Sequence, residues 1–122
     1  MDAKQVRLEK KLEDLLGQAT AVAVELQGIE QGPGTPHYDQ IELPAHALGQ
    51  RFSRMIQRER ARDVAACGLA DAACPDCERK CRVQTKTRDV HSMDGPTDLT
   101  ETIAKCRHCR RSFFPSAGRA GI

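Results

Sequence analysis

The stretch from Cys74 to Cys109 reads CPDCERKCRVQTKTRDVHSMDGPTDLTETIAKCRHC, and it decides the fold of this 122-residue chain. Two Cys-x-x-Cys pairs, Cys74/Cys77 and Cys106/Cys109, bound this stretch and are separated by 28 residues. Four thiolates at about 2.3 Å complete a tetrahedron around Zn²⁺, and two residues between ligands allow one turn to hold the ion from two sides. The spacing therefore predicts two metal-binding knuckles around a single zinc ion.

The segment between the two pairs has the pattern of a β-hairpin. Residues 82–91 and 98–105 alternate in the strand sense and are rich in Thr, Val and Ile. A turn at Met93-Asp-Gly-Pro96 separates them, and a third short strand is expected at residues 112–114, ended by Pro115. A hairpin with one knuckle at each base is a zinc ribbon.

Other uses of the four cysteines are two disulfides, a redox-active dithiol or an iron site. Nothing in the sequence indicates the oxidising compartment that disulfides require, and a thioredoxin-like dithiol needs one Cys-x-x-Cys pair in a βαβ context. Iron in a Cys₄ cage stays open, because the spacing suits it too, but zinc is favoured. Four thiolates leave no coordination position for water, and the chain has no P-loop, HExxH helix or GxSxG elbow, so we expect no enzymatic activity.

The remaining cysteines and histidines complete no second ligand set. We expect Cys67 and Cys81 to be small buried or half-exposed thiols. His108 lies inside the second knuckle, where its ring should point away from the ion. Alternative nitrogen ligands would be His37, His46, His91 and His108.

The N-terminal third has the pattern of a helix with a leucine seam. We expect a helix from Ala3 to about Leu26, interrupted at Gly17, with the stretch from Thr20 to Leu26 also alternating as a strand would. The seam either packs against the chain's own second helix or forms a homodimeric coiled coil through residues 8–29, and both alternatives stay open. Its members lie at steps of four and three: Leu8, Leu12, Leu15, Ala19, Val22, Leu26 and Ile29.

Residues 28–44 contain three glycines and three prolines, which predicts a linker or extended loop. Residues 45–70 then read as a second helix, with apolar Leu48, Phe52, Met55 and Ile56. The charge run at residues 58–63 is expected to be a solvated face of this helix.

Taken together, these patterns predict a small α+β protein. A helical hairpin or coiled-coil segment occupies residues 1–71, with its linker at 28–44; a Cys₄ zinc ribbon occupies 72–117, and a tail follows at 118–122. Only 3% of the residues are aromatic, so the core should be thin and dependent on the metal. No apolar stretch resembles a secretion signal or a membrane span, which predicts a cytoplasmic protein without membrane contact.

The cysteine-rich part of the chain is basic, with ten Lys and Arg against six Asp and Glu over residues 73–122. One hypothesis is that the folded hairpin gathers these cations into a patch that contacts DNA phosphates. The other is a protein-interaction or dimerisation module that the zinc only stabilises, because six acidic residues dilute the positive field. The candidate DNA contacts are Arg79, Lys80, Arg82, Lys86, Arg88, Lys105, Arg107, Arg110 and Arg111.

Residues 74–116 resemble the N-terminal zinc-ribbon region of bacterial insertion-sequence transposases of the ISKra type. The resemblance favours the DNA-binding hypothesis and implies a part in DNA transposition by a mobile element. That family's catalytic RNase H-like domain is absent from this sequence, which implies no transposase activity and a truncated or split product, or a remnant without function of its own. The matching residues are Cys74, Pro75 and Cys77, Gly95 in the turn, Cys106 and Cys109, and the closing Phe113, Phe114 and Pro115.

Two positions depart from that family's pattern. Its knuckles commonly place glycine after the second cysteine, where the backbone turns left-handed and offers N–H groups to sulfur, whereas this chain has Glu78 and Arg110. A non-glycine residue in that conformation costs roughly 1 to 2 kcal/mol. Zinc binding to such sites contributes about 10 to 16 kcal/mol, so we expect a weakened site that still forms.

Overall fold

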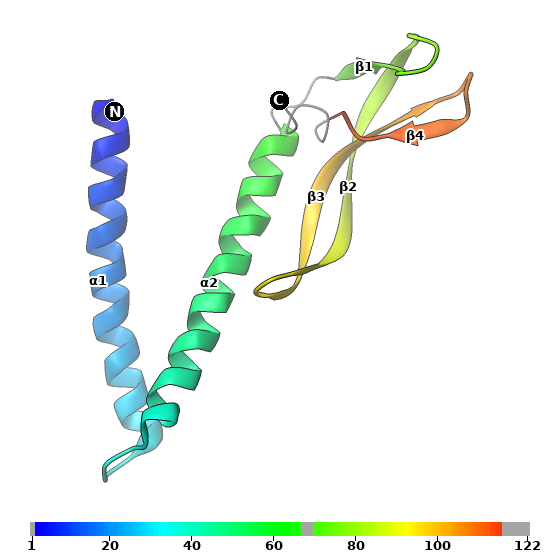
Figure 1. Ribbon diagram of the computed structural model, residues 1–122. Coiled ribbons are helices and arrows are strands. Elements are labelled where there is room, and N and C mark those ends of the chain that lie inside the picture. Colours follow the sequence, from blue (N-terminus) through cyan, green and yellow to red (C-terminus); the bar gives the residue numbers. More distant parts are fainter. Residues whose placement is uncertain (1, 67–69, 116–122) are drawn as a thin grey trace. The chain divides into compact units, whose positions relative to one another are not determined.

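The computed structural model describes residues 2–66 and 70–115 (Figure 1). Two helices, α1 (Ala3–Gln31) and α2 (Tyr38–Ala66), precede the strands β1 (Asp71–Ala73), β2 (Lys80–Ser92), β3 (Gly95–Cys106) and β4 (Arg111–Phe113). The strands form one antiparallel sheet in the order β1-β2-β3-β4. The predicted class, a small α+β protein with two helices before a cysteine ribbon, is confirmed.

Residues 1–45 form one compact unit, and residues 46–122 form the other. The boundary between these units lies within α2. Each unit is described below by itself.

Helix α1 is longer than predicted and is not broken. It begins after Asp2, whose side chain accepts a 2.7 Å hydrogen bond from the backbone N–H of Gln5, and it continues past Leu26 to Gln31. Gly32, with a φ of 69°, ends it. The predicted interruption at Gly17 is wrong, because one interior glycine costs only about 1 kcal/mol relative to alanine and a 29-residue helix tolerates it.

The predicted linker at residues 28–44 is mostly helical, and α2 begins at Tyr38 instead of residue 45. Gln40 supports this early start, because its backbone N–H donates to the carbonyl of His37 while its side chain accepts from the His37 N–H at 2.9 Å. Pro44 lacks the N–H that would satisfy the carbonyl of Gln40. Gln31 replaces it, because its Nε2 donates to that carbonyl at 2.8 Å.

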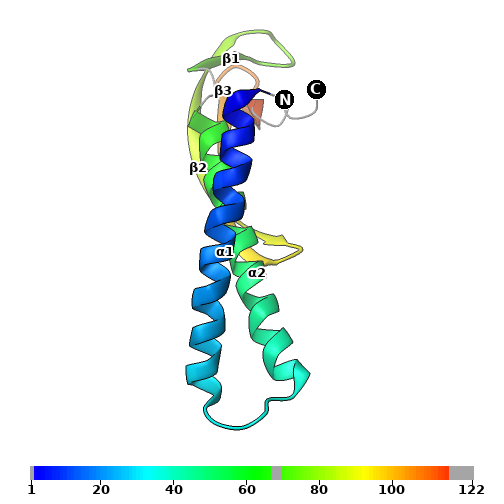
Figure 2. The ribbon, with the colours of Figure 1, turned by 90° about the vertical axis from the view of Figure 1, so that its left-hand side faces the viewer.

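The main feature of the second unit is the long hairpin of β2 and β3, which lie side by side in both views (Figures 1 and 2). Their register runs from Val83↔Ala104 to Ser92↔Gly95, so both strands are longer than predicted and the turn is only Met93 and Asp94. Gly95 takes a φ of 107°, which suits the residue that follows such a turn. The predicted third strand is confirmed as β4, shifted by one residue.

Strand β1 was not predicted, because the three residues Asp71-Ala-Ala73 have no strand propensity of their own. Pairing with β2 at Ala72↔Cys81 and Ala73↔Lys80 holds them extended. Helix α2 is described to Ala66, and Cys67 lies outside the described residues. Ala70, the predicted last residue of this helix, is not helical, and its carbonyl accepts a hydrogen bond from the N–H of Val83 at 2.9 Å.

Helix α2 contacts the hairpin through three polar side chains. Ser53 Oγ donates to a carboxylate oxygen of Asp94 at 2.5 Å, Arg54 Nη1 donates to the Asp94 carbonyl at 2.7 Å, and Arg58 Nε lies 3.0 Å from Asp98 Oδ1. The expectation of a wholly solvated charge run at 58–63 is therefore wrong at Arg58, which is half-buried against β3.

The core is thin, as the composition predicts. In the described part of the chain, the buried hydrophobic residues are Ala65, Cys74, Cys81, Ala104 and Cys106, joined by the buried polar Thr97 and Thr102. No described residue of α1 is buried. Neither helix, as far as it is described, combines the length and hydropathy needed to cross a membrane.

Candidate metal centre

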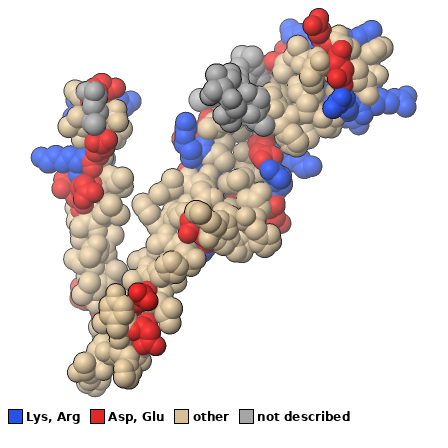
Figure 3. Space-filling view, in the orientation of Figure 1, with Lys and Arg blue, Asp and Glu red and all other residues tan. Residues whose placement is uncertain are grey.

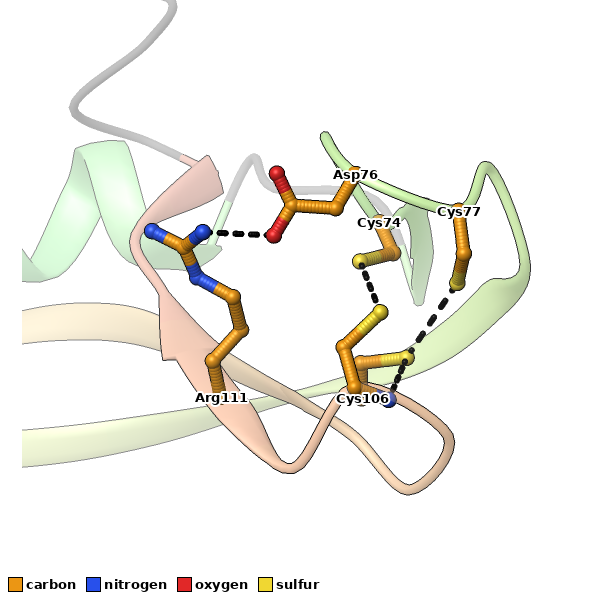
Figure 4. Close-up of polar contacts among 6 residues, drawn as sticks. Cys74, Asp76, Cys77, Cys106 and Arg111 are labelled. Carbon is orange, nitrogen blue, oxygen red and sulfur yellow. Dashed lines mark hydrogen bonds and ion pairs between the residues drawn. The ribbon is translucent and has the colours of Figure 1, made fainter.

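The four cysteines predicted as ligands meet at one point. Their Sγ atoms all lie within 4.8 Å of one another, with Cys74 3.9 Å from Cys109 and Cys77 3.5 Å from Cys106. Figure 4 shows the sulfurs of Cys74, Cys77 and Cys106 pointing toward one another. Four ligands at about 2.3 Å from a central ion would be about 3.8 Å apart, so the cluster has the size of a tetrahedral site.

Each knuckle is shaped by its own backbone. Cys74 directly follows β1; its N–H donates to the carbonyl of Arg79 at 2.8 Å, and its carbonyl accepts from the N–H of Glu78 at 2.9 Å. Cys106 ends β3, and the N–H of Cys109 donates to its sulfur at 3.4 Å. These hydrogen bonds close the turn of each knuckle, and the two sulfurs of each Cys-x-x-Cys pair lie in the same cluster.

The expected left-handed residues are confirmed. Glu78 has a φ of 62° and Arg110 a φ of 55°, and they are the non-glycine residues with positive φ in the described chain. Both knuckles therefore carry the backbone strain that the missing glycines imply.

The thiols influence one another's ionisation. The pKa of Cys106 is lowered to about 6, first because the backbone N–H of Cys109 donates to its sulfur. The pKa of Cys109 is raised to about 12, mainly through its contact with the thiol of Cys77 and through burial. Cys106 therefore ionises readily, whereas contact with the neighbouring thiols and burial oppose ionisation of Cys109. A bound cation would allow all four thiols to ionise together.

Burial makes the centre a closed one. Cys74 and Cys106 are each 1% exposed, and Cys77 and Cys109 are half-buried. Four protein sulfurs are enough to fill a tetrahedral coordination sphere, as in structural metal sites.

An ion pair that sequence reasoning missed joins the two knuckles. Arg111 Nη1 lies 2.5 Å from Asp76 Oδ2 (Figure 4). The two residues are 35 positions apart in the sequence, and no local sequence pattern predicts that they are in contact. Arg111, predicted as a DNA contact, thus has a partner inside the protein.

Cys81 and the histidines lie outside the four-sulfur cluster. Cys81 is buried beside Cys74 and Cys106 and donates weakly to the carbonyl of Arg79 at 3.4 Å, which matches the expected buried thiol. In the described residues, no histidine belongs to a group that could hold a metal ion.

The nine predicted DNA contacts divide between the knuckles and the hairpin. Two of them besides Arg111 are paired: Lys80 Nζ lies 3.6 Å from Asp71, and Arg88 Nη2 lies 2.7 Å from Glu101. Basic side chains project from the end of the sheet that carries β1 and β4, with acidic ones among them (Figure 3). The candidates with no ion pair in the described part of the chain are Arg79, Arg82, Lys86, Lys105, Arg107 and Arg110.

Comparisons of the chain with known protein families, with curated proteins and with solved structures gave no significant match. The resemblance to ISKra-type transposases therefore depends on the residues matched in the sequence alone.

Proposed function

We propose that this chain is a zinc-ribbon module that binds DNA, and that it corresponds to the N-terminal zinc-ribbon region of an ISKra-type transposase. The observation that carries the proposal is the meeting of four sulfurs, from two knuckles, within 4.8 Å. With the coordination sphere filled by protein, the ion stabilises the ribbon and takes no part in a reaction.

Zinc is proposed over iron because a four-coordinate Cys₄ site is one of the usual forms of structural zinc. Elemental analysis of protein purified without added metal tests this assignment. The expected result is about one zinc per chain. Iron with the visible absorption of a ferric thiolate centre would contradict it, as would a metal-free protein whose ribbon is fully ordered.

DNA binding is supported by the excess of cations in the ribbon, six of which have no ion pair in the described residues. Binding of a labelled duplex, titrated at several salt concentrations, tests it. Because phosphate contacts release counterions, log affinity should fall linearly with log salt concentration. No binding at low salt, or an affinity that ignores salt, would contradict DNA binding.

A second candidate function is a dimerisation or protein-interaction module without DNA binding. It is favoured by the leucine seam of α1, whose Leu8, Leu12, Leu15, Val22, Leu26 and Ile29 are between 49% and 74% exposed. Sedimentation equilibrium should then give twice the chain mass. Leu15→Ser, in the seam, should restore the monomer, whereas Val24→Ser, an equally apolar site outside the seam, should not.

A further inference from the structure

Strand register decides which basic side chains share a face of the hairpin. Successive residues of a strand point to opposite faces, so Lys80, Arg82, Lys86 and Arg88 of β2 share one face. Lys86 is paired with Glu101 of β3, which puts the odd-numbered residues of β3 on the same face. Lys105 belongs to that set. Five of the nine candidate contacts therefore lie on one face, called the basic face below.

The opposite face is unsuited to an anion. It carries the buried Cys81, Ala104 and Cys106 of the core at the knuckle end. Further along, Asp89 is paired with Asp98, so two carboxylates lie across from each other there. Asp98 is also engaged by Arg58 of α2.

Carboxylates neutralise only part of the basic face. Asp71 lies across from Arg82 and contacts Lys80, and Glu101 lies across from Lys86 and contacts Arg88. Lys86 and Lys105 are exposed and have no ion pair in the described chain. Arg82 precedes Val83 on β2 and Lys105 follows Ala104 on β3, so these two cations come directly after the Val83↔Ala104 pair on neighbouring strands. Like charges at such neighbouring positions destabilise a sheet, and an anion bound there would relieve them.

The row of cations fits the phosphate backbone of a duplex better than the unpaired bases of a single strand. Lys80 and Arg88 are eight positions apart on the strand, which is about 26 Å at the usual rise per residue. Proteins that bind single strands stack bases on aromatic side chains. Strands β2 and β3 contain no Phe, Tyr or Trp that could provide such a platform.

We infer that the basic face, Lys80, Arg82, Lys86, Arg88 and Lys105, is a docking surface for the phosphate backbone of duplex nucleic acid. The inference rests on the proposed DNA binding and specifies its surface and its substrate class. Contacts of this kind position a protein on the duplex without reading its sequence, so binding should be nearly independent of base sequence.

A matched pair of double variants tests the surface. Lys86→Gln with Lys105→Gln removes two charges from the basic face, and Arg51→Gln with Arg60→Gln removes two exposed charges from α2, where neither arginine has an ion pair in the described residues. Fluorescence anisotropy of a labelled mixed-sequence duplex with the zinc-loaded full chain gives affinity against salt. The basic-face variant should reduce the magnitude of the log–log salt slope by about 2 and the affinity at 0.1 M salt by roughly 50-fold. The α2 variant should leave both close to the wild-type values.

The outcomes separate the surface from the function. If wild-type protein does not bind duplex, the proposed DNA binding fails. If it binds and both double variants lose equal affinity, or neither loses any, the basic face is not the surface. Tighter binding of a single strand of the same length than of the duplex would overturn the substrate class. Unchanged zinc content in both variants confirms that the ribbon is intact.

Discussion

Glu78 and Arg110 occupy equivalent places in the two knuckles, one residue after the second cysteine, and both have a positive φ, 62° and 55°. The same left-handed backbone conformation thus occurs twice at the candidate metal centre. Neither position has glycine, the residue that adopts this conformation without steric cost. In the first knuckle, the N–H of Glu78 donates to the Cys74 carbonyl at 2.9 Å and closes the turn Cys74-Pro-Asp-Cys77.

Replacing these residues should therefore strengthen the site. We expect Glu78→Gly and Arg110→Gly each to stabilise the zinc-bound ribbon by about 1 kcal/mol, because glycine adopts positive φ without steric cost. Competition with a chromogenic chelator measures the gain as an increase in zinc affinity of roughly fivefold per site. Glu78→Ala is the matched control, since it removes the carboxylate but keeps the strain. An equal gain in that control would assign the effect to charge instead of backbone conformation.

Loss of a ligand should remove the metal and unfold the ribbon selectively. Cys74→Ser or Cys109→Ser should lower the zinc content from about one per chain to nearly none after dialysis, because each contributes one of four ligands. Amides of β2 and β3 should then lose protection from hydrogen exchange, while circular dichroism retains the helical signal. Cys81→Ser is the control: it alters a buried thiol of the same region and should keep the metal. Zinc loss in that variant would show that Cys81 takes part in binding.

Zinc affinity should rise with pH. Cys106, with a pKa of about 6, is already a thiolate at pH 7, whereas Cys109, with a pKa of about 12, still holds its proton. Zinc binding at neutral pH must therefore displace at least the Cys109 proton. Chelator competition between pH 6.5 and 8.5 should show log affinity increasing by about one or more per pH unit. A flat profile would mean that all four thiols are ionised before the metal binds.

The parts of this structure that could be predicted from the sequence are those set by short spacing. Two Cys-x-x-Cys pairs identify Cys74, Cys77, Cys106 and Cys109 without any knowledge of the fold, and the residue after each pair identifies the strained positions. The early start of α2 could not be predicted in this way. It depends on Gln31 donating to the carbonyl of Gln40 across a loop, which offsets the missing N–H of Pro44.

The same limit applies to pairs that meet only after folding. Asp76 and Arg111 form an ion pair between the knuckles, and Arg58 forms one with Asp98. The sequence separation of neither pair predicts that its residues are in contact. Strand β1 likewise exists because β2 is there to pair with it. Composition could show that the ribbon is basic, but strand register was needed to assign five of the cations to one face.

The hairpin turn provides a test of how α2 holds the ribbon. Gly95 has a φ of 107°, and a Cβ at this position would lie 3.2 Å from Nη1 of Arg54, whose guanidinium donates to the Asp94 carbonyl. Gly95→Ala should therefore destabilise the hairpin by about 1 to 2 kcal/mol, since it adds backbone strain and crowds the arginine. Hydrogen exchange of the β2 and β3 amides measures the loss.

Gly49→Ala is the matched control, because Gly49 lies inside α2 and a methyl group added there would have nothing within 4 Å. It should stabilise the helix by up to about 1 kcal/mol. If Gly95→Ala proved as harmless as Gly49→Ala, the turn would have to tolerate a side chain by moving away from Arg54. The contact between Asp94 and α2 would then be too weak to hold the hairpin against the helix.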